Sequence, residues 1–140
     1  MDDIDRQLLA LLRVNARATI ASLAKHLKVA RGTVQNRIAR LERSGTIVGY
    51  SVRLQPQADA NRIAALMTIE VAGTHLERVL RTLRGDPQVH TLHTTNGRWD
   101  LVAEISADSL AALDQVISRI RRIEGVARSE TSLLLTTHKL

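Results

Sequence analysis

The segment TIASLAKHLKVARGTVQNRIARLERS, residues 19–44, decides the fold of the first part of the chain. Its apolar residues recur at the spacing of two amphipathic helices, and only three residues, 28–30, separate the two patterns. A connection of that length between short helices is typical of a helix-turn-helix. The apolar positions are Ile20, Leu23, Ala24 and Leu27 in the first helix, and Val34, Ile38 and Leu41 in the second.

The second of these helices has a polar, basic face. Four residues, at positions 33, 36, 37 and 40, lie at helical spacing, so we expect their side chains to point away from the core together. Arginine and asparagine can form paired hydrogen bonds with guanine and adenine edges, and arginine also binds phosphates. Taken alone, a basic outer face is more often only a solvated surface. The residues predicted to contact DNA are Arg31, Thr33, Gln35, Asn36, Arg37 and Arg40.

The excess positive charge of the chain lies in its first part. The 140 residues carry a net charge of +6. Residues 1–53 hold ten Lys and Arg against four Asp and Glu, a net of +6, whereas residues 54–140 hold ten of each. A basic module beside a neutral one is expected when only the first meets nucleic acid.

The rest of the first part predicts one more helix and a strand. Residues 4–14 have an inward apolar stripe, and Asp3 is the expected N-cap. Thr19 is expected to cap the next helix, whereas Ala30 offers no capping hydroxyl to the third. Residues 46–54 are rich in β-branched residues and predict a strand, and residues 55–62 predict a linker.

The second part alternates between strand and helix patterns in the order β-α-β-β-α-β, which is the ferredoxin-like arrangement. Asn96-Gly97 lies between two strand patterns and favours a hairpin. One face of the sheet is expected to pack against both helices and the other against a second copy of the chain. The expected strands are 65–72, 89–95, 101–106 and 126–137, and the helices are 75–84 and 110–123, the latter capped by Asp108 or Ser109.

Composition and missing motifs exclude several classes of protein. There is no Cys, and we expect no metal site, because His90 and His93 lie three apart on a predicted strand and should face opposite sides. The acidic N-terminus and the lack of a long apolar run argue against a signal peptide or membrane span, which favours a cytoplasmic protein. No phosphate loop or activated nucleophile is recognisable, so no catalytic residue is predicted.

In order and spacing, these segments resemble the Lrp/AsnC (feast/famine) transcriptional regulators over essentially the whole chain. The resemblance implies a fold of class α+β, with a three-helix, winged-helix-like domain and a ferredoxin-like βαββαβ sensing domain. It assigns residues 1–45 to DNA binding, 46–62 to a connecting strand and linker, and 63–140 to effector binding and oligomerisation. The matching segments are IDRQLLALL (4–12), NAR (15–17), SLAKHLKVARGTVQNRIARLERSGTIVGY (22–50) and GRWDL (97–101).

The resemblance also implies a small-molecule effector, an amino acid or related metabolite, held between subunits of a homodimer or octamer. The family's glycine–x–x–aspartate hairpin matches Gly97 and Asp100. Loop N–H groups could hold a carboxylate, and Asp100 could bind an ammonium group. Trp99 stands where the family more often has tyrosine, and a plain turn with Trp99 in an interface is the alternative. The implied effector residues are Thr94, Thr95, Asn96, Gly97, Arg98, Trp99, Asp100 and Thr131.

We therefore predict a sequence-specific, double-stranded-DNA-binding transcriptional regulator that responds to a metabolite and uses no cofactor. Two alternatives stay open at this point. An architectural DNA-binding protein without an effector would have the same charge distribution. A ferredoxin-like dimeric enzyme with a fused helical domain would instead need a catalytic arrangement.

Overall fold

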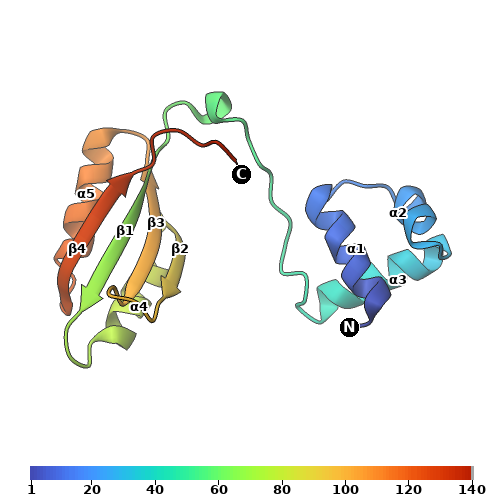
Figure 1. Cartoon of the computed structure of the whole chain (residues 1–140), viewed down its shortest axis with the longest axis horizontal. Helices are drawn as coiled ribbons and strands as arrows, with labels where there is room; N and C mark the ends of the chain where they lie inside the picture. The colour runs from blue at the N-terminus through green and yellow to red at the C-terminus, as the bar shows by residue number, and fades with distance from the viewer. Residues whose placement is uncertain (140) are drawn as a thin grey trace. The chain divides into compact units, whose positions relative to one another are not determined.

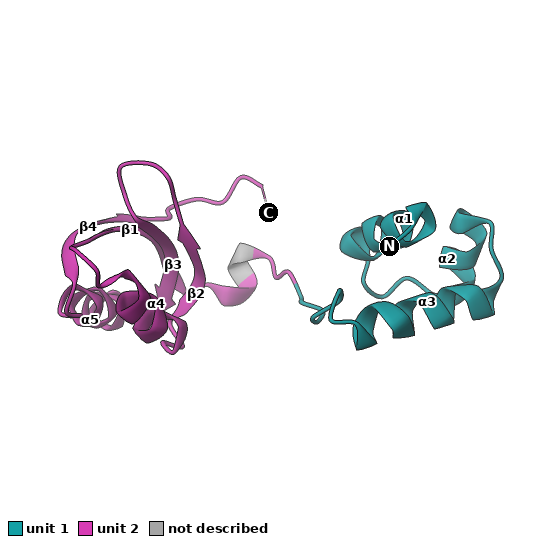
Figure 2. Ribbon diagram, turned by 90° about the horizontal axis from the view of Figure 1, so that it is seen from below, with its two compact units in different colours: residues 1–52 teal, residues 53–140 magenta. Residues whose placement is uncertain are grey.

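The computed structural model describes residues 1–139, apart from the side chains of Pro56 and Gln57. The chain divides into two compact units, Met1–Val52 and Arg53–Leu140 (Figure 2). Their boundary falls inside the segment 46–62 that the sequence assigns to the connection. Leu140, the last residue of the predicted sensing domain, lies outside the described residues.

Unit 1 consists of the helices α1 (Asp3–Val14), α2 (Ile20–Leu27) and α3 (Arg31–Arg43) (Figure 1). Their apolar stripes meet in one core, in which Leu8 and Val34 are fully buried. Lys28 adopts the left-handed conformation at the end of α2, with φ 55° and ψ 43°, so the chain turns within three residues into α3. The predicted helix-turn-helix is confirmed.

The helix starts follow the capping residues, with one correction. Asp2, not Asp3, is the N-cap of α1. Its carboxylate accepts from the Asp5 N–H at 2.9 Å, and the Asp5 carboxylate accepts from the Asp2 N–H at 3.0 Å, which satisfies two free donors reciprocally. Asp5 stands three residues after Asp2, the spacing that this capping box requires. Thr19 caps α2, and Ala30 provides no side-chain cap for α3, as expected.

The strand predicted for residues 46–54 is wrong. This segment has no regular secondary structure, and Val48 and Val52 are 94% and 84% exposed. A strand requires a neighbouring strand to pair its backbone N–H and C=O groups, which β-branched composition alone does not supply. Unit 1, whose residues are all described, therefore contains helices but no wing strand.

Unit 2 forms a four-stranded antiparallel sheet with the strand order β2-β3-β1-β4. This confirms the predicted ferredoxin-like βαββαβ arrangement. A short 3-10 helix, η1 (Pro56–Asp59), precedes the sheet. The elements are β1 (Ile63–Val71), α4 (Leu76–Arg84), β2 (Val89–Thr94), β3 (Leu101–Ala107), α5 (Leu110–Arg121) and β4 (Val126–Leu133).

Both helices of unit 2 lie on the same face of the sheet (Figure 2). Alternate strand residues point to this face, so Met67, Ile69 and Ile105 are fully buried against α4 and α5. The other residues of the strands form the opposite face, where Leu66 is 39% exposed beside Glu104 and Ser132 on the neighbouring strands. Packing of this mixed face on a second copy remains a prediction.

Gly125 fixes the turn between α5 and β4. It has φ +102°, and a Cβ there would overlap the side chain of His75, which precedes α4. Only glycine allows both this backbone conformation and this close approach. None of the helices in the described part of the chain is both long enough and apolar enough to span a membrane.

Candidate nucleic-acid interface and effector hairpin

Helix α3 presents most of the residues predicted to contact DNA. Val34 and Leu41 are buried in the core of unit 1, which leaves the rest of the helix facing outward. The structure leaves Arg31, Gln35, Asn36 and Arg40 exposed, while Thr33 is half-buried. These exposed donors and acceptors are of the kind that reads base edges and binds phosphates.

Arg37 does not point away from the core as the sequence predicts. Its Nη1 contacts the Asp2 carboxylate at 2.7 and 2.8 Å and the Asp5 carboxylate at 2.8 Å, and its side chain is only 19% exposed. The prediction is wrong because the N-terminal turn of α1 packs against this part of α3 and supplies two carboxylates. Arg40 approaches the same cluster, with Nη2 2.7 Å from Asp5 Oδ2.

Asp2 and Asp5 are the residues that sequence reasoning missed here. The Asp5 side chain is 1% exposed and accepts hydrogen bonds from Arg37, Arg40 and the Asp2 N–H. The bond from Arg37, followed by that from the Asp2 N–H, lowers the pKa of Asp5 to about 2. The Asp5 N–H and then Arg37 lower the pKa of Asp2, whose carboxylate in turn raises the pKa of Arg37. The available signal was an acidic N-terminus in an otherwise basic module.

The hairpin between β2 and β3 is present, but not as the tight two-residue turn that Asn-Gly favours. The strands are joined by a six-residue loop, residues 95–100, and neither Asn96 nor Gly97 has a positive φ. The Thr95 hydroxyl contacts the Trp99 carbonyl and also accepts from the Gly97 N–H at 3.2 Å. These side-chain bonds stabilise the loop, which is one residue longer than the connection 96–100 expected from the sequence.

Asp100 closes this loop onto the end of β1. Its Oδ2 accepts from the Val71 N–H at 2.7 Å. The predicted ammonium-binding carboxylate therefore has one oxygen committed to the fold. Beside it, the Arg98 guanidinium lies over the Trp99 ring, 5.2 Å from the ring centroid, so Trp99 is covered on one face by a cation.

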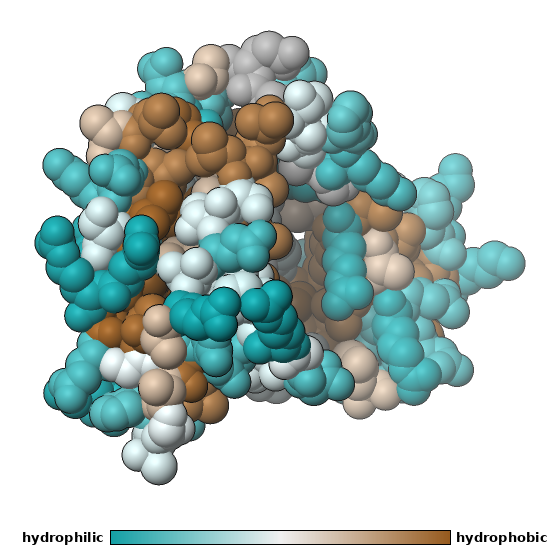
Figure 3. Space-filling model, turned by 60° about the vertical axis from the view of Figure 1, so that its left-hand side comes forward, coloured by the Kyte–Doolittle hydropathy of each residue, from teal (hydrophilic) through white to brown (hydrophobic). Residues whose placement is uncertain are grey.

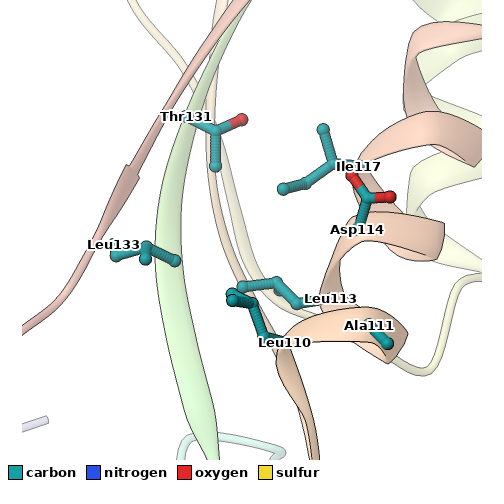
Figure 4. A pocket seen from close by; sticks show the side chains of 7 residues that line it. All are labelled: Leu110, Ala111, Leu113, Asp114, Ile117, Thr131 and Leu133. Atoms are coloured by element: carbon teal, nitrogen blue, oxygen red, sulfur yellow. The ribbon is translucent and has the colours of Figure 1, made fainter.

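Thr131 is not brought together with the hairpin within one chain. It lies on β4 and pairs with Met67 of β1, on the helix-covered side of the sheet. β1 separates β4 from β3. Its side chain lines a groove of about 510 Å³, in which residues of α5 face residues of β4 (Figure 4). The face of the molecule seen in Figure 3 carries apolar surface between polar side chains. The groove is lined by Leu110, Ala111, Leu113, Asp114, Ile117, Thr131 and Leu133.

A polar cluster at the other end of β3 was also not predicted. Ser106 is 5% exposed, and its hydroxyl contacts His90 Nε2 at 2.5 Å and accepts from Arg62 Nε at 2.9 Å. Among the described residues, no group of three or more His, Asp or Glu side chains is placed to hold a metal ion.

Each of the two units matches a protein-family model. Residues 1–42 match the AsnC-type helix-turn-helix domain, and residues 64–140 match the Lrp/AsnC ligand binding domain. The chain belongs to the Lrp/AsnC family. It is a transcriptional regulator with a DNA-binding helix-turn-helix and a ligand-binding domain, not an enzyme.

Individual relatives of this Lrp/AsnC regulator match it over nearly their whole length. The regulator LrpA1 of Halobacterium salinarum is 33% identical over 134 residues, which cover 95% of this chain and 94% of LrpA1. The structure of Escherichia coli AsnC is 25% identical, with a TM-score of 0.83, and covers 100% of this chain and 95% of AsnC. The complex of the Neisseria meningitidis regulator NMB0573 with L-Met has the same fold, at 21% identity and a TM-score of 0.84. The match covers 100% of this chain and 93% of that regulator.

Proposed function

We propose that this Lrp/AsnC regulator binds specific DNA sequences through α3, and that an amino acid or related metabolite changes its assembly and DNA affinity. The observation that carries the proposal is the exposed polar face of α3. This face lies on unit 1, and residues 1–53 carry the whole excess positive charge of the chain, whereas residues 54–140 are neutral overall.

The DNA contacts are assigned by exposure and chemistry. Asn36 and Gln35 are exposed amides suited to adenine edges, and Arg31 and Arg40 are exposed guanidinium groups suited to guanine or phosphate. Thr33, at the first turn of the same helix, is the further predicted contact, whereas Arg37 acts by holding α3 in place. In a homodimer, two copies of α3 would enter successive major grooves about one helical turn apart.

The effector is assigned to the hairpin of residues 94–100. A Cβ on Gly97 would meet only the Thr95 Oγ1, at 3.7 Å, and Gly97 has no positive φ. The fold of a single chain therefore does not require glycine here, whereas close approach of a ligand to the backbone would. Asp100 Oδ1, the oxygen that does not bind Val71, is left for an ammonium group. The L-Met complex of the Neisseria meningitidis regulator supports an amino acid as the class of ligand.

Effector control requires more than one chain. We propose a homodimer formed through the open face of the sheet, and octamers assembled from such dimers. Thr131 would then contribute to an effector site only from a neighbouring subunit, because one chain keeps it apart from the hairpin. A regulator that acts on the chromosome would work in the cytoplasm.

The DNA half of the proposal is tested by competition binding. The labelled duplex is the DNA upstream of the chain's own gene, and the competitors are the same duplex and a shuffled duplex of equal composition. A sequence-specific regulator is displaced at much lower concentrations by its own duplex. Equal displacement by both competitors would contradict specific binding and indicate an architectural DNA-binding protein.

A further inference from the structure

The N-terminal turn of α1 contacts the middle of the recognition helix α3 through charged groups. Arg37 Nη1 lies within 2.8 Å of both Asp2 oxygens and of Asp5 Oδ1. Arg40 Nη2 lies 2.9 Å from Asp5 Oδ1 and 2.7 Å from Asp5 Oδ2. Two carboxylates and two guanidinium groups thus form one neutral cluster, which we call the acidic clamp: Asp2, Asp5, Arg37 and Arg40.

The two arginines of the acidic clamp are held to different degrees. Arg37 is 19% exposed, and its Nε is buried without a hydrogen-bond partner, so its guanidinium is largely withdrawn from water. Arg40 is 56% exposed while it binds the same buried Asp5 carboxylate. Because a buried charge needs its counter-ion, Arg37 is committed to the clamp, whereas Arg40 can exchange Asp5 for an outside anion.

The start of α3 lacks a capping side chain, so the acidic clamp at its middle is the nearest polar restraint on the helix. Ala30 gives α3 no side-chain cap, so its first turn is held by the core packing of Val34 and not by a capping hydrogen bond. A rotation of α3 by about 20° would move a side-chain tip about 6 Å from the axis by about 2 Å. That displacement is enough to break the hydrogen bonds of Asn36 or Gln35 to base edges.

We infer that Asp2 and Asp5 are positioning residues that set the rotation of α3 for base readout, and that a DNA phosphate competes with Asp5 for Arg40. The inference rests on the proposed DNA-binding function. By charge alone, these two acidic residues would oppose DNA binding. The inference gives them a part in distinguishing one DNA sequence from another. The clamp weakens attraction to any phosphate backbone and orients the helix that distinguishes one sequence from another.

The test compares Asp5→Asn with Asp3→Asn. Asp3 is on the same turn of α1 and its recorded side-chain partner is Arg6, not a residue of α3, so Asp3→Asn removes the same charge without opening the clamp. Fluorescence anisotropy measures affinity for the upstream duplex and for a shuffled duplex between low and moderate salt. Circular dichroism checks that each variant is folded, and Asp2→Asn, at a carboxylate that is 53% exposed, is the milder second variant.

The clamp predicts that Asp5→Asn changes the affinities for the two duplexes by different factors. Affinity for the shuffled duplex rises, because the phosphate that binds Arg40 no longer has to displace Asp5. The ratio of specific to shuffled affinity falls by about tenfold. Asp3→Asn raises both affinities together and keeps the ratio within about twofold. Equal changes in Asp5→Asn and Asp3→Asn would overturn the inference.

A second measurement tests the acidic clamp without comparing the affinities for the two duplexes. In ¹⁵N NMR spectra, the Nε signal of Arg40 should shift when the shuffled duplex is added to the full chain, while that of Arg37 stays in place. A shift of both signals, or of neither, would contradict the clamp. If the wild-type chain shows no preference between duplexes, the proposed specific function fails, and these signals still report whether Arg37 and Arg40 differ.

Discussion

Asp100 accepts a hydrogen bond from the backbone N–H of Val71, and this bond ties the β2–β3 hairpin to the end of β1. The bond to Val71 requires only an acceptor oxygen, whereas the proposed effector contact would require the negative charge of Asp100. Asn retains an acceptor oxygen without the charge. Substitutions at this position can therefore distinguish the fold of the hairpin from its ligand.

Asp100→Asn should remove the effect of the amino-acid ligand on DNA binding and leave the hairpin in place. Asp100→Ala should remove the effect and also destabilise unit 2, by about 1.5–3 kcal/mol, because the Val71 N–H loses a charged acceptor. Isothermal titration of the ligand and chemical denaturation measure the two effects. A normal response in Asp100→Asn would place the effector elsewhere.

The glycines Gly97 and Gly125 should respond differently to alanine. Gly125→Ala forces a side chain into a left-handed backbone and into His75, at a cost of about 2–5 kcal/mol. Gly97→Ala meets only an ordinary contact with Thr95 and should change the free energy of unfolding by less than about 0.5 kcal/mol. Ligand affinity should nevertheless fall in Gly97→Ala. An unaltered affinity would show that no ligand approaches this backbone.

Ala30→Ser should stabilise unit 1. Ala30 already has the extended N-cap backbone, with φ −67° and ψ 151°, but no side-chain oxygen to accept from the first turn of α3. A serine there should add about 1 kcal/mol to the free energy of unfolding. Urea denaturation followed by circular dichroism measures the change. A loss of stability would mean that the start of α3 has no room for the hydroxyl.

Asn36→Ala should weaken binding to the specific duplex far more than to a shuffled one. The expected loss is about 1–3 kcal/mol, the value of one good amide–base contact. Gln7→Ala is the matched control, because Gln7 is an exposed amide on α1, outside the helix-turn-helix. Equal losses in the two variants, measured by anisotropy, would remove Asn36 from the readout face.

Unit 1 should lose stability in acid because of Asp5. The folded pKa of Asp5 is about 2, below the ordinary value of about 3.9 for an unfolded chain. A carboxyl group whose pKa is lowered by folding stabilises the folded state at a pH above its unfolded pKa. This contribution should therefore disappear as the pH falls from about 4 to about 2. The free energy of unfolding, followed through the NMR signals of Leu8 and Val34, should be less pH-dependent in Asp5→Asn. An unchanged pH dependence would contradict the low pKa.

Local periodicity explains what could be predicted from the sequence. Leu23, Val34 and Met67 lie in apolar patterns that determine which face of each helix or strand is buried, and these patterns placed three helices and the βαββαβ order correctly. Thr19 caps α2 as expected, and α5 is capped by Ser109, one of the two expected residues, because an N-cap depends on residues only three positions away.

The errors concern contacts that a local pattern cannot contain. Arg37 lies 35 residues from Asp2, and nothing in the spacing of α3 indicates that carboxylates from α1 would reach it. Residues 46–54 have the composition of a strand but no neighbour to pair with. The grouping of Thr131 with Asp100 stays a prediction, because the sheet order places β1 between β4 and β3 and only a neighbouring subunit could bring the two residues together.

The central claim, that an effector controls specific DNA binding, is tested most directly by one titration. The full chain is bound to the duplex upstream of its own gene, and each free amino acid is added in turn at constant salt while anisotropy reports the affinity. The account predicts that one amino acid, or a few related ones, changes the affinity for this duplex in the wild type but not in Asp100→Asn. An affinity that stays constant throughout the panel, or that changes equally in Asp100→Asn, would contradict it.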